Sequence, residues 1–244
     1  MSETPFKGKL IESAVDKTNL TLGKLKELEG NRSKIIRVIT YEKLKSRYDS
    51  KIEPFEVATA AKRLFGELQE KYNIPVSVNF VIGKDENGEK VVYTLTDRIE
   101  GEPMHKIDFT IPENKELLSK VEELFVSLTK YFKDKINNGG YYLIDIFKPE
   151  QYVIGFRDED KNRKIHLVDT DLYIGNEKYA IYKIVGDMLR YISIVEENIG
   201  VRFEMVREEM RKFISESPES VSGNDNSEKT VRIHKQIIFD LLAR

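Results

Sequence analysis

Apolar residues recur at intervals of three and four through much of the chain, and this spacing places them on one face of a helix. The clearest case is 114–136, where the apolar stripe is followed by Gly139 and Gly140, residues suited to ending a helix. The same spacing predicts further helices over 54–72, 179–198, 201–215 and 230–243. We therefore expect a chain rich in amphipathic helices.

Runs of β-branched and aromatic residues predict strands between these helices. The first strands are expected within 9–40 and include the β-branched run 34–39. Two further runs, 76–82 and 90–96, flank Asp85-Glu86-Asn87-Gly88, and the Asn-Gly pair supplies the backbone conformations that a tight hairpin turn needs.

A second hairpin is expected from strands at 151–156 and 164–169, because the intervening 157–163 is too charged to be buried. Asp145 precedes the first of these strands and Asp169 ends the second, so an antiparallel return brings the two carboxylates to one end of the ladder. Neighbouring carboxylates repel each other unless a cation lies between them, and oxygen ligands in small number suit Mg²⁺. The pattern predicts a magnesium site here; the alternative is a surface hairpin with solvated acids.

Composition narrows the class of protein. The 244 residues are 40% hydrophobic and 34% charged, as in soluble globular proteins, and the formal net charge of −2 gives no reason to expect nucleic acid or an anionic membrane as partner. The absence of cysteine excludes disulfides and thiolate sites, and three scattered histidines argue against structural zinc. No apolar run approaches the roughly 18 residues of a membrane span, and the first residues lack a signal-peptide core, so we expect a cytoplasmic protein.

The segment 142–171 carries a resemblance. Asp145, then Lys148-Pro149-Glu150 and the amide of Gln151, a short hairpin, and an apolar strand ending in Asp169 resemble the catalytic core of the protein-kinase-like superfamily, including its aminoglycoside-phosphotransferase-like branches. The resemblance implies that Asp145 accepts the proton of the substrate hydroxyl and that Gln151 and Asp169 hold Mg²⁺. Asp171 would be an optional second metal carboxylate, since Asp169-Thr170-Asp171 stands where many of these proteins have D-F-G.

Several residues depart from the family pattern. Asp145 and Gln151 are one residue further apart than in D-x-x-x-x-N, and Leu143 and Ile144 stand in place of the His and Arg of H-R-D. An alignment anchored on Lys148-Pro149-Glu150 would instead put Ile146 at the position of the base. With that alignment the chain would lack a base.

The resemblance also assigns roles near the N-terminus. Arg37 is the cation best aligned to hold the α- and β-phosphates, with Lys34 as the alternative. Glu56, or less favourably Glu67, would pair with that cation from the helix 54–72, and a solvated carboxylate at the edge of the helix is the competing interpretation. The stretch 13–19, where a phosphate-covering loop is expected, contains no glycine, which predicts a weak grip on nucleotide.

The stretch 94–101 resembles the link between the two lobes of a kinase. By that likeness Thr96 occupies the gatekeeper position, and backbone groups of Asp97 to Ile99 would meet adenine. We refer to residues 97–99 as the hinge segment.

The order of predicted elements indicates an α+β, bilobal, protein-kinase-like fold with a small β-rich N-lobe and a mostly helical C-lobe. The N-lobe would span 1–97 and the C-lobe 98–214, followed by a flexible linker at 215–229 and a terminal helix at 230–244 that docks within the chain or binds a protein partner. The implied function is an ATP- and Mg²⁺-dependent phosphotransferase acting on an unknown small-molecule or protein hydroxyl. The alternatives are a pseudokinase-like binding module and an interaction protein without nucleotide.

Overall fold

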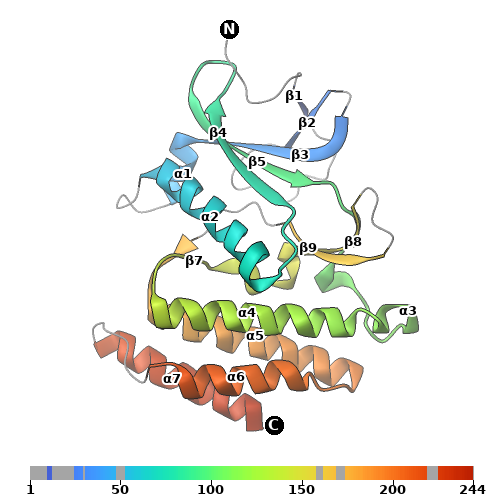
Figure 1. Ribbon diagram of the computed structural model, residues 1–244, viewed down its shortest axis with the longest axis vertical. Coiled ribbons are helices and arrows are strands. Elements are labelled where there is room, and N and C mark those ends of the chain that lie inside the picture. The colour runs from blue at the N-terminus through green and yellow to red at the C-terminus, as the bar shows by residue number, and fades with distance from the viewer. Residues whose placement is uncertain are drawn as a thin grey trace.

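A five-stranded antiparallel sheet forms one end of the molecule (Figure 1), in the order β1-β2-β3-β5-β4. The computed structural model describes residues 10–12, 25–29, 31–47, 53–157, 162–168, 174–218 and 225–243. The strands of this sheet are β1 Leu10–Glu12, β2 Leu25–Leu28, β3 Asn31–Thr40, β4 Val78–Lys84 and β5 Lys90–Asp97. The strands predicted at 34–39, 76–82 and 90–96 are confirmed.

The turn between β4 and β5 is longer than the predicted tight turn. Asp85 closes it by accepting hydrogen bonds at Oδ1 from the N–H groups of Asn87 and Glu89, each at 2.9 Å. Gly88 alone of the Asn-Gly pair has a positive φ, at 84°. A side-chain acceptor therefore organises this turn in addition to the glycine.

Two helices, α1 Tyr41–Arg47 and α2 Pro54–Tyr72, lie against the sheet, and α2 runs diagonally from the sheet towards the other end of the molecule. Glu53 caps α2 by accepting the N–H groups of Phe55 and Glu56 at Oε2, and the positive φ of 54° at Asn73 ends the helix. The predicted helix 54–72 is confirmed, whereas α1 was not predicted.

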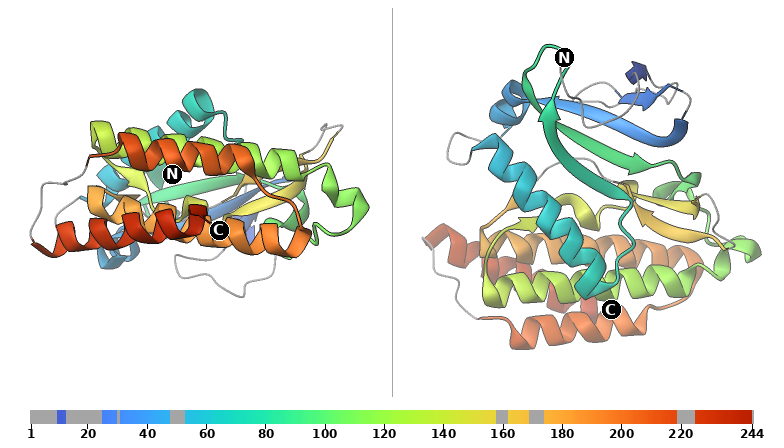
Figure 2. Two further views of the ribbon diagram at one scale, coloured as in Figure 1. Left: turned by 90° about the horizontal axis from the view of Figure 1, so that it is seen from below. Right: turned by 45° about the horizontal axis from the view of Figure 1, so that its top comes forward.

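Long helices in two layers form the other end of the molecule, with α6 and α7 covering α4 and α5 (Figures 1 and 2). Their bounds are α4 Leu118–Asn138, α5 Lys178–Ile199, α6 Glu204–Glu216 and α7 Asp225–Ala243. A short helix, α3 Pro112–Lys115, and a 3₁₀ turn, η1 Met104–Lys106, precede α4, so the helix predicted from residue 114 is divided. None of the helices in the described ranges is long and apolar enough to cross a membrane.

The helix α7 begins at Asp225, five residues before the predicted start, and α6 runs to Glu216, so both helices enter the stretch assigned to a linker. The first turn of α7 is polar and includes Asp225, Asn226 and Ser227, residue types that favour helix starts although they add nothing to an apolar stripe. Periodicity alone therefore placed the start too late.

Small sheets join the two ends of the molecule. Three strands, β6 Glu100–Pro103, β8 Tyr152–Phe156 and β9 Lys164–Leu167, pair antiparallel in the order β6-β8-β9, and β7 Tyr142–Leu143 pairs with β10 Ile174–Gly175. The second predicted hairpin is confirmed as β8 and β9. The fold is thus α+β, with a small β-rich lobe and a mostly helical lobe, in the element order that the kinase-like hypothesis predicts.

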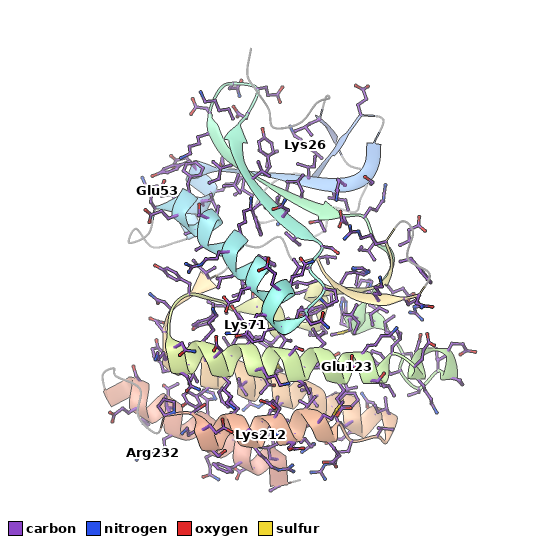
Figure 3. All side chains as sticks on the ribbon, viewed as in Figure 1. Lys26, Glu53, Lys71, Glu123, Lys212 and Arg232 are labelled. Atoms are coloured by element: carbon purple, nitrogen blue, oxygen red, sulfur yellow. The ribbon has the colours of Figure 1, made fainter. Side chains whose placement is uncertain are left out.

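Contacts between α2 and α4 hold the two lobes together. Lys135 of α4 donates to Glu67 of α2 at 2.6 Å, and Lys71 donates to Asp134 at 2.8 Å. Next to these ion pairs the rings of Tyr72 and Tyr131 meet edge to face, with centroids 5.4 Å apart. Figure 3 shows Lys71 at the end of α2 that adjoins α4.

The helix α7 packs on α5 through Val231, Ile238 and Leu242, all of which are buried. His234 lies on the same helix and is partly buried, and a Cβ at Gly186 of α5 would be 3.8 Å from its Nδ1. Burial lowers the pKa of His234, an effect that the charges of Arg190 and Lys183 reinforce and that of Asp187 opposes. The protonated form of His234 is therefore disfavoured in the folded chain.

A double-mutant cycle on Glu67 and Lys135 should give a coupling energy above about 1 kcal/mol in urea unfolding, because these side chains are only 23% and 10% exposed. The control is the pair Glu208–Lys212 on α6, whose side chains are 64% and 48% exposed (Lys212 is labelled in Figure 3). That pair should give about 0.3–0.5 kcal/mol. Equal coupling energies in the two cycles would contradict a stabilising role for the partly buried Glu67–Lys135 ion pair between α2 and α4.

The pKa of His234 also predicts a pH dependence of stability. The stability that neutral His234 contributes is fully present above its ordinary pKa of 6.5. This stability is lost as the pH falls from there through the lower pKa of the folded state, because the unfolded chain takes up the proton first. Urea unfolding of His234→Gln at pH 8 and pH 5.5 should show a smaller loss of stability on acidification than the parent. The same loss in both proteins would exclude a role for His234.

Candidate functional site

The loop that carries the expected catalytic residues consists of two consecutive 3₁₀ turns, η2 Asp145–Phe147 and η3 Pro149–Gln151. The side chain of Asp145 is 18% exposed, and Lys148 Nζ lies 3.0 Å from its Oδ1. Ile146, the competing candidate for the position of the base, is fully buried in the core. The two turns separate Asp145 from Gln151 and leave the Asp145 carboxylate partly buried.

Gln151 lies directly beside the end of β9. The N–H of Val168 donates to the Gln151 carbonyl at 2.9 Å, which continues the pairing of Tyr152 with Leu167. The hydroxyl of Tyr152 donates to the carbonyl of Ile146 at 2.5 Å and so ties the hairpin to the loop before it. Gln151 is therefore adjacent to the residue that precedes Asp169 in the sequence. Asp169 and Asp171, the predicted metal carboxylates, lie outside the described residues.

The sheet places the two candidate phosphate-binding cations on opposite faces, because side chains alternate along a strand. Arg37 pairs with Thr94 across β3 and β5, and these two residues share the face of Thr96. Lys34 projects from the other face, where it forms an ion pair with Asp97. Of the two cations, Arg37 is the one that shares a face with the gatekeeper candidate.

The side chain of Asp97 is held by two cations. It pairs with Lys34 of β3 through Oδ1 and with Arg157, directly after β8, at 3.0 Å through Oδ2, while only 11% of the side chain is exposed. Its ion pairs therefore connect the five-stranded sheet to the β8–β9 hairpin.

The backbone of the hinge segment is partly engaged within the sheets. The N–H of Asp97 donates to the Ser77 carbonyl at 3.0 Å, and that of Arg98 to the Ser33 carbonyl at 2.9 Å. Ile99 is partly buried. The predicted contact of this segment with adenine stays a prediction.

Glu67 of α2 does not take the partner that the kinase likeness implies. Glu67 is engaged by Lys135, and Lys34 by Asp97. Glu56 lies exposed in the first turn of α2. Its pairing with Arg37 stays a prediction.

The segment Pro75–Ser77 joins the parts of the site. The N–H of Ser77 donates to the Leu167 carbonyl at 3.0 Å, and the N–H of Leu167 donates to the Pro75 carbonyl at 2.8 Å, around a parallel bridge between Val76 and Leu167. Since the Ser77 carbonyl also accepts the N–H of Asp97, one short segment holds both the hinge segment and the end of β9.

Sequence reasoning missed the polar pair at this junction. His166 Nδ1 lies 3.1 Å from Ser77 Oγ, and the two residues are 4% and 5% exposed. The pair comes from positions 89 residues apart, so no local spacing could have revealed it. Its burial indicates that it helps fix the junction.

The candidate metal ligands among the described residues are oxygen donors. Asp145 and Gln151 offer carboxylate and amide oxygens of the kind that bind Mg²⁺. Among the residues that the structure describes there is no group of three or more His, Cys, Asp or Glu side chains that could hold a metal ion. A magnesium site would thus need Asp169, and its geometry stays a prediction.

Comparison with known proteins gives little further information. No protein-family model matches the chain, and a search of curated proteins found no match. Among solved structures, the chain is similar to a crystal structure of the Helicobacter pylori proinflammatory kinase CtkA, at 10% sequence identity and a TM-score of 0.32. The alignment covers 96% of this chain and 95% of that one.

The ion pairs of Asp97 predict a cost for losing its charge. Asp97→Asn should lower the free energy of unfolding by about 1–2 kcal/mol in low salt, because the partly buried Asp97 carboxylate forms ion pairs with two cations. This loss of stability should be smaller in 1 M NaCl, which screens the ion pairs. Asp187→Asn is the control, since Asp187 pairs with Arg190 on one helix face at side-chain exposures of 34% and 49%. A cost no larger than that of the control, about 0.5 kcal/mol or less, would argue against a structural role for the Asp97 pairs.

Proposed function

We propose that this protein is an ATP- and Mg²⁺-dependent phosphotransferase that binds nucleotide between its lobes and acts on a hydroxyl acceptor of unknown identity. The observation that carries the proposal is the bond between Gln151 and Val168. This backbone bond puts Gln151 beside the strand end that leads into Asp169, and the bond from the Tyr152 hydroxyl to the Ile146 carbonyl ties the hairpin to the loop that carries Asp145. An acid, an amide and a further acid in this arrangement suit proton acceptance beside a metal-bound phosphate.

Each residue has a defined task in the proposed reaction. The acceptor oxygen bonds to the γ-phosphorus of ATP while the bond to the β,γ-bridging oxygen breaks, ADP leaves, and Asp145 takes the hydroxyl proton. Lys148 stands 3.0 Å from Asp145, where its charge would stabilise the oxygens of the transferring phosphoryl group. Arg37 would meet the other phosphates and the hinge segment the base. Mg²⁺ held by Asp169 and Gln151, with Asp171 as a further ligand, would neutralise phosphate charge.

A binding module without transfer is the second candidate, and specific observations favour it. In the kinase likeness the position of the phosphate-binding lysine falls on Arg37, whose planar guanidinium does not substitute freely for an ammonium. The carboxylate of Glu67 is engaged by Lys135. A site with these changes could hold a nucleotide between the lobes and yet fail to align it for transfer.

Thermal-shift and calorimetric titrations with ATP, with and without Mg²⁺, test the proposal. ATP at about 100 times its dissociation constant should add about 2.7 kcal/mol of stability to the parent. Asp169→Ala should abolish the effect of Mg²⁺. Asp145→Asn should keep binding but lower the release of labelled phosphate from γ-labelled ATP, to protein or water, by about 10²–10⁴-fold.

The outcomes separate the candidates. Mg²⁺-dependent binding with transfer that Asp145→Asn removes supports the phosphotransferase. Binding in the parent without any transfer supports the binding module. No stabilisation at millimolar ATP would overturn both, and Asp187→Asn, remote on α5, serves as the control for nonspecific effects of removing a carboxylate.

A further inference from the structure

Two threonine hydroxyls are buried on the inner face of the large sheet without a hydrogen-bond partner. Thr94 is 0% exposed and Thr96 is 6% exposed, and the Oγ1 atom of each has no partner. Buried hydroxyls nearly always have one. Two such hydroxyls at alternate positions of one strand make this face a candidate for a ligand that would complete them.

Other threonines show how the fold usually satisfies this group. Thr129, also 0% exposed, donates to the carbonyl of Phe125 at 2.8 Å, four residues earlier in α4. Thr59 donates likewise to Phe55 in α2. On β5 the carbonyls are engaged in ladders with β3 on one side and β4 on the other. A helical threonine can donate to the carbonyl four residues earlier. Thr94 and Thr96 lie on a strand and have no such acceptor.

Arg37 is the partly exposed residue next to Thr94 on this face. Ile39 and Val92, which pair across β3 and β5, are fully buried and lie where α1 and α2 cover the sheet. Further along the same face of β3, Arg37 and Ile35 are partly exposed, and they pair with Thr94 and Thr96. On the β4 side, Phe80 and Val78 pair with the same two threonines and are buried. A ligand would therefore reach Thr94 from the side of Arg37.

Arg37 supplies a positive charge on this face. It lies directly across the ladder from Thr94, so the two side chains emerge as neighbours on one face. A guanidinium and a neutral hydroxyl donor side by side suit a phosphate group, whose oxygens accept from both.

We propose that Thr94 and Arg37 form a phosphate subsite, in which the Thr94 hydroxyl donates to a phosphate oxygen that the Arg37 guanidinium also binds. The subsite forms on binding, because Thr94 is covered in the free protein and the flexible side chain of Arg37 must shift towards the ligand to admit a phosphate oxygen. The proposal rests on the proposed function for its nucleotide, but it requires only phosphate binding and not transfer.

The test is Thr94→Val, which keeps the shape of the side chain and removes its hydroxyl, with Thr129→Val as the matched control. Calorimetry with pyrophosphate, MgATP and adenosine should show binding of pyrophosphate and MgATP weakened about tenfold or more by Thr94→Val, as for one hydrogen bond to a charged group, with adenosine unchanged. Thr129→Val should leave all three affinities as in the parent.

The melting temperature of the free protein supplies an independent readout. Thr94→Val should melt at the same or a higher temperature than the parent, since it removes an unsatisfied buried group, whereas Thr129→Val should melt lower because it loses a bond. Unchanged pyrophosphate affinity in Thr94→Val, a loss confined to adenosine, or destabilisation of the free protein would each overturn the subsite. Binding of pyrophosphate that depends on Thr94 without phosphate transfer would refute the phosphotransferase and leave the subsite standing. A parent that binds neither pyrophosphate nor MgATP would refute both.

Discussion

The hydrogen bonds around Pro75–Ser77 are the constraint on which the site depends. This segment leaves α2, bonds to Leu167 at the end of β9 and accepts the amide of Asp97 before it enters β4. It supports the hinge segment and the strand that leads to Asp169 directly from one short stretch of backbone. Because the Ser77–His166 pair is buried at the same place, the junction is polar but sheltered from water, which makes its bonds costly to break.

The contacts between α2 and α4 are the second connection between the two lobes. The C-terminal half of α2 is bound to α4 by two ion pairs and an aromatic contact, while its N-terminal part packs against the sheet. The C-terminal end of α2 is therefore held by the helical lobe. Asp97 adds a third connection, since its carboxylate joins β3 to the end of β8 through Lys34 and Arg157.

Charge is distributed unevenly around the candidate site. Lys34 and Lys148 form ion pairs with the carboxylates of Asp97 and Asp145. Arg37 and Thr94 lie next to each other on the opposite face of the sheet from the Lys34–Asp97 pair. The proposed phosphate subsite and that ion pair are therefore separated by the sheet.

The sequence by itself determined the elements whose signals are local. The period of apolar residues located α2 and α5 within a few residues, and the β-branched and aromatic runs with their turn residues located the hairpins. The order of these elements was enough to predict the α+β bilobal fold. The pairing of β3 with β5 showed that Lys34 and Arg37 lie on opposite faces, and only the tertiary structure decided which face α1 and α2 cover. Only the tertiary structure decided that Asp97 engages Lys34, that Lys135 engages Glu67 and that Ser77 meets His166, because these partners are 63, 68 and 89 residues apart and nothing in the local pattern selects one distant charge over another.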